Sequence, residues 1–184
     1  KFESDILPSE FTKALIQGNG TLSYQIDVLS LEYNASAWTL TGEYMRGKNV
    51  TRLKGNIFPT LVERPGSSYL QFTYHDDNRL DYFVRYEDQR ADRNDPNGKG
   101  FVDAVFIPLQ PFLSVLQVTP SPYHSRYSFD KTIGLAWKPS ADFMLRAEWH
   151  HVIGTSEVAN YLFNKKTLTK EWDLIAVQLS YRFK

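Results

Sequence analysis

The closing stretch of the chain, residues 171–184, reads EWDLIAVQLSYRFK and decides the fold class. Every second position is apolar, and small or polar residues lie between. The apolar set is Ile175, Val177, Leu179, Tyr181 and Phe183. Successive side chains of a β-strand point to opposite faces, so this spacing predicts a strand with one apolar face and one polar face. Such a strand separates two different environments.

The same alternation recurs along the chain and predicts further strands. With the closing strand at 171–183, the expected set is 21–33, 37–48, 67–75, 79–90, 126–138 and 141–153. One row of side chains is apolar and rich in aromatic residues, and the other row is polar. In the first strand the apolar parity switches near Val28 and Leu29, which predicts a β-bulge.

Composition limits the functional classes. The chain has 184 residues, enough for one domain, and its Lys plus Arg count of 21 equals its Asp plus Glu count of 21. A net charge of zero leaves no global basic field, which argues against a nucleic-acid partner. Cysteine is absent, so disulfides, thiolate metal sites and cysteine nucleophiles are excluded.

The connections between the predicted strands alternate in length. Short linkers fall at 34–36, at 76–78 and at Ser140, whereas long ones fall at 49–66, 91–125 and 154–170. Outer-membrane barrels have short periplasmic turns, long extracellular loops and an outward apolar band. The expected fold is therefore all-β, a transmembrane antiparallel up-and-down β-barrel with about seven strands over residues 21–184. Residues 1–20 are expected to form a loop or short helix.

A soluble barrel or sandwich remains an alternative, because it alternates in the same way but turns its apolar row inward. Two features favour lipid outside. The apolar row is edged by aromatic residues and is nearly free of Lys and Glu, and the strands exceed the five or six residues or so that are typical of soluble sheets. The longest uncharged run, 104–125, holds four prolines and is not expected to be a membrane-spanning helix.

The ordered set of strands resembles the Gram-negative outer-membrane β-barrel class. FMLRAEWHHVIGT followed by EWDLIAVQLSYRF is similar to the carboxy-terminal hairpin of porin-like proteins, and the resemblance covers residues 21–183. It implies location in the bacterial outer membrane, contact with outer-membrane lipid, and recognition of Ile175 to Phe183 by the barrel-assembly machinery. Lys184 departs from the class, since it follows the usual terminal Phe.

Strand direction leads to one more expectation. If the last strand runs toward the periplasm, counting back through the loops makes the strand at 21–33 run the same way. An oppositely directed strand must then precede it. The chain is therefore expected to be the carboxy-terminal part of a larger barrel, completed by a missing N-terminal barrel segment or by a partner chain.

The resemblance also bears on the loop at 91–125, whose second half is apolar. Its prolines are expected to prevent a single clean strand or helix. In porin-like barrels a long loop folds into the lumen and narrows it, which the similarity suggests here. The alternative is a hydrophobic patch that packs on the rim or on a neighbouring subunit.

Charged residues with inward parity are the candidate functional site. They form an expected belt near mid-height of the lumen, made of Glu43, Arg85, Glu87, Asp130, Arg146 and Glu148. A belt of both signs acts either as a constriction that orients polar solutes or as a salt-bridge network that fills the interior. Both interpretations stay open at the level of sequence.

No catalytic, cofactor or metal site is expected. His150 and His151 are adjacent in a strand, point to opposite faces and cannot share one ion. The stretch from Asp95 resembles a calcium loop, but Phe106 stands at the twelfth position, where a bidentate Glu is required. An enzyme such as a lipid-modifying hydrolase lacks a credible Ser, His and acid set.

The sequence thus predicts a porin-like outer-membrane channel for passive diffusion of small polar solutes. The alternative is a non-conducting structural or adhesive barrel that acts through its extracellular loops.

Overall fold

The computed structural model describes residues 20–53, 60–77, 79–115, 119–158 and 168–183. Within these ranges the chain forms one eight-stranded antiparallel sheet in up-and-down order. The strands are β1 (Gly20–Asn34), β2 (Trp38–Leu53), β3 (Leu61–Glu63), β4 (Gly66–Asp76), β5 (Leu80–Arg90), β6 (Tyr127–Ser140), β7 (Phe143–Gly154) and β8 (Glu171–Tyr181). A helix, α2 (Lys99–Val115), and a 3-10 turn, η1 (Tyr123–Arg126), lie between β5 and β6.

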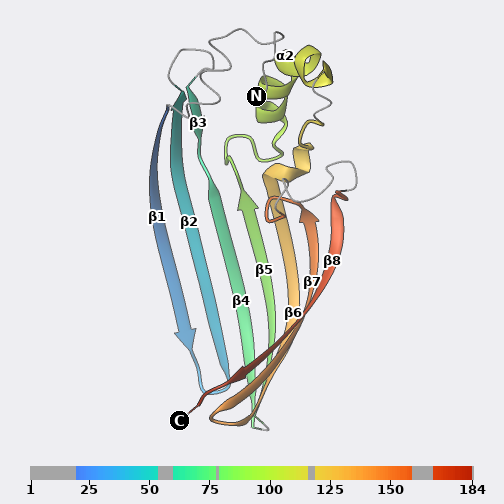
Figure 1. Ribbon diagram of the computed structural model, residues 1–184. Coiled ribbons are helices and arrows are strands. Elements are labelled where there is room, and N and C mark those ends of the chain that lie inside the picture. Colours follow the sequence, from blue (N-terminus) through green and yellow to red (C-terminus); the bar gives the residue numbers. More distant parts are fainter. Residues whose placement is uncertain (1–19, 54–59, 78, 116–118, 159–167, 184) are drawn as a thin grey trace.

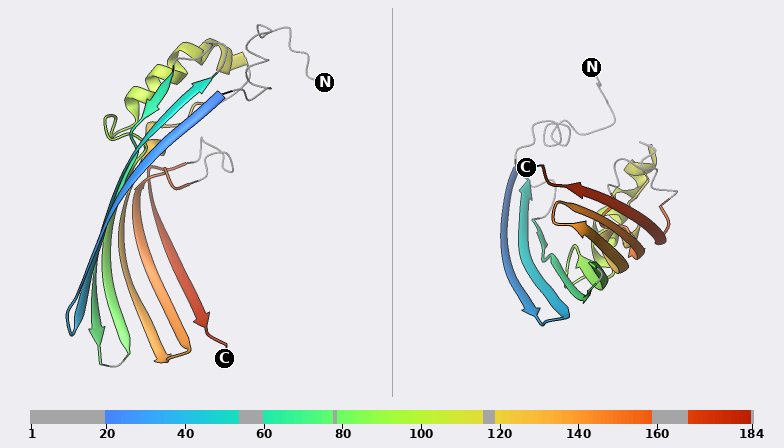
Figure 2. Two further views of the ribbon diagram at one scale, coloured as in Figure 1. Left: turned by 90° about the vertical axis from the view of Figure 1, so that its left-hand side faces the viewer. Right: turned by 90° about the horizontal axis from the view of Figure 1, so that it is seen from below.

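The sheet curves into an open trough and does not close on itself (Figure 2). Cross-strand partners share a face, so the register assigns each side chain to one side. On the apolar side Ile133 is 52% exposed and Ile175 is 75% exposed, whereas on the polar side Asp130 is only 4% exposed. Side chains converge and screen one another on the concave side of a curved sheet. The polar row therefore lies on the concave face and the apolar row on the convex face.

The seven predicted strands are confirmed, and so is the alternation of loop lengths. The short turns after β1, β4 and β6 gather at one end of the sheet (Figure 1). The strand ends that lead into the long connections, at Leu53 of β2, Arg90 of β5 and Gly154 of β7, lie at the opposite end, which we call the long-loop end. The predicted segment 1–20 lies outside the described residues except for Gly20, the first residue of β1.

The long connection predicted at 49–66 is partly strand. β2 continues to Leu53, and β3 and β4 pair with β2 in one continuous register, from Asn49–Glu63 to Arg46–Gly66 and onward. Between these pairs the Gly47 amide donates to the Pro65 carbonyl at 2.8 Å. β3 and β4 thus follow one line that is interrupted near Pro65, which has no N–H to donate.

The bulge predicted near Val28 and Leu29 is wrong. β1 pairs with β2 from Gly20–Leu53 to Asn34–Thr39 with no register shift. The parity switch instead marks a change in which face is apolar, since Val28 lies on the concave side and Leu29 on the convex side. The register shift that the structure does show lies between β6 and β7, at Trp137 and Ser140.

The helix α2 corrects a second expectation, because it includes Pro108 and Pro111. An internal proline costs about 3 kcal/mol in a helix, so other contacts must offset that cost. The Asp95 carboxylate accepts the amides of Gly100 and Phe101 at 3.0 and 2.7 Å, which satisfies unpaired donors at the start of the helix.

The helix lies beyond the long-loop ends of the strands (Figure 1), which agrees with the rim alternative for this segment. The Arg126 guanidinium stacks 4.0 Å from the Phe101 ring centre, and the Tyr123 hydroxyl donates to Asp103 at 2.8 Å. These two contacts hold α2 against η1. Among the helices that the structure describes, none is long and apolar enough to cross a membrane.

Candidate functional site

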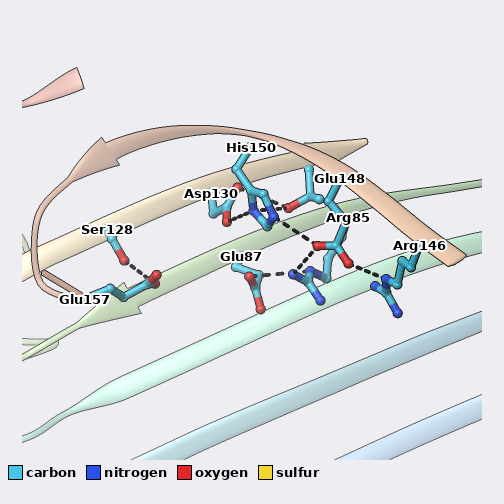
Figure 3. Close-up of polar contacts among 9 residues, drawn as sticks. Arg85, Glu87, Ser128, Asp130, Arg146, Glu148, His150 and Glu157 are labelled. Atoms are coloured by element: carbon cyan, nitrogen blue, oxygen red, sulfur yellow. Dashed lines mark hydrogen bonds and ion pairs between the residues drawn. The ribbon is translucent and has the colours of Figure 1, made fainter. Parts of the chain in front are cut away.

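The concave face of β5, β6 and β7 carries a network of charged side chains (Figure 3). The register confirms that all six predicted belt residues share this face. One row across the strands runs from Glu43 through Tyr69 and Glu87 to Asp130. Arg85 and Glu148 fall in the next two rows toward the short turns, and Arg146 in a third. The belt therefore spans several rows rather than one ring.

His150 connects the carboxylates of the network. Its Nδ1 lies 2.7 Å from Asp130 Oδ2, and its Nε2 lies 2.9 Å from Glu148 Oε2 (Figure 3). The Thr132 hydroxyl donates to the other Asp130 oxygen at 3.1 Å. Both ring nitrogens thus face carboxylates, so the imidazole of His150 links Asp130 on β6 to Glu148 on β7.

Glu148 is the acceptor that the cations share. Arg85 Nη2 lies 4.0 Å from Glu148 Oε2, and Arg146 Nε pairs with Glu148 Oε1. Arg85 Nε also lies 3.4 Å from Glu87 Oε2. Although both Nε atoms are within ion-pair range, neither makes a well-directed hydrogen bond to any described residue. The ion pairs therefore neutralise the two guanidinium charges, although the Nε–H groups of Arg85 and Arg146 are not hydrogen-bonded to described residues.

An aromatic ring packs within the network, in the same row as Glu148. Phe83 is 5% exposed and lies opposite Gly134 in the register. A Cβ built on Gly134 would approach the Phe83 ring to 2.3 Å, so only glycine permits this close packing. The Arg146 guanidinium stacks 4.3 Å from the centre of the same ring. This packing orients Arg146 beside Glu148.

Glu43 stays apart from the other five belt residues. Its Oε2 accepts the Ser30 hydroxyl at 3.0 Å, and it forms no ion pair with any residue that the structure describes. At the long-loop end of the network, the Ser128 hydroxyl donates to Glu157 at 2.8 Å (Figure 3). Sequence reasoning left His150 and Glu157 out of the belt. His150 has the same strand parity as Glu148, so the sequence could have assigned it to the concave face. Glu157 follows β7, where strand parity no longer indicates a face.

The two adjacent histidines have separate environments, as predicted. His151 lies on the convex face, where its Nδ1 is 3.1 Å from Asp173 and its ring stacks on Trp149 at 6.2 Å between centres. In the described ranges no group of three or more His, Asp or Glu side chains is arranged to hold a metal ion. Asp95, the first residue of the calcium-like stretch, instead caps α2.

The predicted assembly residues lie on or just after β8, an edge strand of the sheet. Four of them form its convex row, and Ile175, Val177, Leu179 and Tyr181 are all exposed. Phe183 follows the strand and packs edge-on against Tyr181, with 5.0 Å between ring centres. In the described residues β8 pairs only with β7, so its other edge is open.

Comparison with protein-family models finds no match for this chain. Comparisons with curated proteins and with solved structures likewise find no significant match. The features of the sheet that bear on function are its exposed apolar convex face, its open edges and its concave charge network.

Proposed function

We propose that this chain forms part of the wall of a porin-like channel in the outer membrane of a Gram-negative bacterium, for passive diffusion of small polar solutes. The convex face contacts lipid, and the concave face borders water. One observation carries the proposal: across β5 to β8 the convex face exposes apolar side chains such as Ile133 and Ile175, whereas the charged residues Asp130 and Glu148 on the concave face are screened. A water-soluble sheet has the opposite arrangement.

The convex apolar band has the form that a bilayer requires. From Leu80 to Tyr86 on β5 every convex side chain is apolar or aromatic, a height of roughly 20 Å at about 3.3 Å per residue. Aromatic residues border the band at both ends. Those nearer the short turns are Trp38, Tyr74, Tyr82, Trp137 and Tyr181, and those nearer the long-loop end are Tyr44 and Tyr86. Such girdles mark the two lipid–water interfaces of outer-membrane barrels.

The open edges support closure by further strands. Six successive antiparallel pairings connect β1 to β8, so these two edge strands run in the same direction. They cannot pair antiparallel with each other. Because an open edge is unfavourable in lipid, an odd number of additional strands would complete the barrel, from a longer chain or a partner chain. The barrel-assembly machinery would read Ile175 to Phe183 at the β8 edge.

A non-conducting structural or adhesive barrel is the second candidate, and the compensated network favours it. Arg85, Arg146 and His150 all converge on Glu148, which resembles a cross-link between strands more than a row of free charges. In this case the long-loop end, with α2, would make the functional contacts.

Planar-bilayer recording of the full-length protein tests the proposal. We expect stepwise conductance with weak ion selectivity, since the concave charges are of both signs. Replacing Arg85 and Arg146 together by Ala should shift the reversal potential toward cations if the network borders the water path. Absence of conductance from protein that has inserted would favour the structural barrel. Unchanged selectivity with lower thermal stability would show that the network is only structural.

A further inference from the structure

A cluster of basic side chains lies on the convex face at the long-loop end of the apolar band. Arg46 and Lys48 come from β2, Arg64 from the junction of β3 and β4, and Arg93 from the segment after β5. We call these four residues the basic cluster. Together with Gln25, Asp27 and Gly47 they line a hollow of about 200 Å³.

The register places this hollow directly beyond the apolar band. Leu29–Tyr44, Asp27–Arg46 and Gln25–Lys48 are alternate pairs of β1 and β2, so they share the convex face. Leu29 is 71% exposed and belongs to the band. The convex surface therefore changes from apolar at the Leu29–Tyr44 pair to charged at the next convex pair, Asp27–Arg46.

Two arginines reach the same place from elsewhere in the chain. Arg64 continues the register that joins Asn49–Glu63 to Arg46–Gly66, which puts it opposite Lys48. The Arg93 amide donates to the Arg64 carbonyl at 2.8 Å. A Cβ on Gly66 would lie 2.5 Å from Arg93 Cδ, so the Arg93 stem crosses the convex face over this glycine.

Among the described residues, the positive charge of the basic cluster exceeds the negative charge that lines the hollow. Four cationic side chains and one carboxylate line the hollow, a local charge of +3 in a chain whose net charge is zero. Arg46 Nε lies 3.0 Å from Asp27, but Lys48, Arg64 and Arg93 form no ion pair with the described part of the chain. Crowded like charges repel, and a bound anion would relieve the repulsion.

We propose that the hollow binds the phosphate group of a membrane amphiphile whose acyl chains lie along Leu29, Tyr44 and Leu70. Guanidinium groups match phosphate oxygens in bidentate geometry, and Lys48 adds a point charge. The neighbouring apolar band accepts the acyl chains. This inference rests on the proposed lipid contact of the convex face, and it specifies which lipid group that face selects.

Native mass spectrometry of the full-length protein from detergent tests the site. The probes are phosphatidic acid, phosphatidylcholine with the same acyl chains, and inorganic phosphate. We expect phosphatidic acid to bind about tenfold more tightly than phosphatidylcholine, and Lys48→Gln with Arg64→Gln to remove that preference. The control, Lys131→Gln with Lys170→Gln, loses the same charge from exposed positions outside the hollow and should change affinity less than about twofold.

Several results would overturn the inference. If the two lipids bind equally, or if the control variant loses the preference for phosphatidic acid to the same extent, the binding is non-specific electrostatic attraction and the hollow is not a site. If inorganic phosphate binds as tightly as phosphatidic acid, the acyl chains contribute nothing and the ligand is not a membrane amphiphile. Gel mobility with and without boiling checks that each variant folds. Protein that conducts but shows no headgroup preference rejects this inference alone, whereas protein that never inserts rejects the proposed function.

Discussion

The concave and convex faces of the sheet differ in where their charged side chains lie and in how those side chains are paired. On the concave face Arg85, Arg146 and His150 all pair with Glu148, so charges of both signs are half-buried and paired. On the convex face the two rows that cross β5 at Tyr82 and Val84 hold no charged side chain. In the basic cluster beyond the band, only Arg46 pairs with a carboxylate among the described residues. This difference is expected if, as proposed, the concave face borders a narrow aqueous space and the convex face borders lipid and its headgroups.

The largest effect is expected from removing the shared acceptor. Glu148→Ala leaves Arg146 without a carboxylate among the described residues, whereas Arg85 keeps Glu87 and His150 keeps Asp130. Breaking a buried ion pair costs about 3–5 kcal/mol, and we expect about 3 kcal/mol at these half-buried positions. Urea titration in detergent measures the free energy of unfolding. Glu43→Ala is the matched control, because Glu43 accepts only the Ser30 hydroxyl among described residues, and it should cost about 1 kcal/mol. Equal losses in the two variants would contradict the special role of the network.

A charge placed on the convex face tests the other half of the comparison. Ile133→Arg puts a cation in the middle of the apolar band and should cost about 2–4 kcal/mol in a bilayer, whereas Val62→Arg near the long-loop end should cost 0–1 kcal/mol or so. Unfolding in lipid vesicles provides the measurement. Both residues are exposed, so a water-soluble protein would tolerate both substitutions equally. That outcome would refute the lipid contact.

Two glycines, one on each face, test how tightly the concave side is packed. Gly134→Ala drives a methyl group into the Phe83 ring and should destabilise by about 1–3 kcal/mol. On the convex face, Gly42→Ala meets Leu70 Cδ1 at 3.3 Å, at the end of a flexible side chain, and should cost less than about 1 kcal/mol. Thermal unfolding in detergent compares them. A larger cost at Gly42 would reverse the assignment of the tighter face.

The smallest effect concerns His124, which lies in η1 and outside both faces. Burial lowers the pKa of His124, and the charge of Lys170 lowers it further. The unfolded chain therefore takes up a proton first, so stability falls as the pH drops through about 6.5 toward the lowered value. NMR titration of the ring should show the lowered pKa, and Lys170→Gln should raise it toward the ordinary value. An unchanged pKa in this variant would remove Lys170 as a cause.

Secondary structure was largely predictable because it depends on local spacing. The seven strands from 21–33 to 171–183 were recognised from alternation alone, and the short turns from their length. The short strand β3 was missed, since Leu61–Glu63 is too brief to show a period. The helix α2 was missed because prolines outweighed the rest of its sequence, while the Asp95 cap and the Arg126 contact form only in the folded chain.

The candidate site was predictable in part. Parity placed six charged residues on one face, and the structure links five of them. The role of His150 did not follow from parity, because it depends on which rows of β6 and β7 lie side by side. Glu43 does not join the network, because Tyr69 lies between Glu43 and Glu87 in their shared row. This arrangement also depends on the register between strands.

The strands, their alternating faces and the alternating loop lengths all follow from the order of the amino acids. Each of these follows from the geometry of neighbouring residues. Three other features depend on how the chain folds: which face is concave, which charges meet, and how Arg64 and Arg93 join β2 at the basic cluster. Such contacts depend on register between segments far apart in the chain, as between Glu87 and Asp130, and a shift of one residue would send each side chain to the other face.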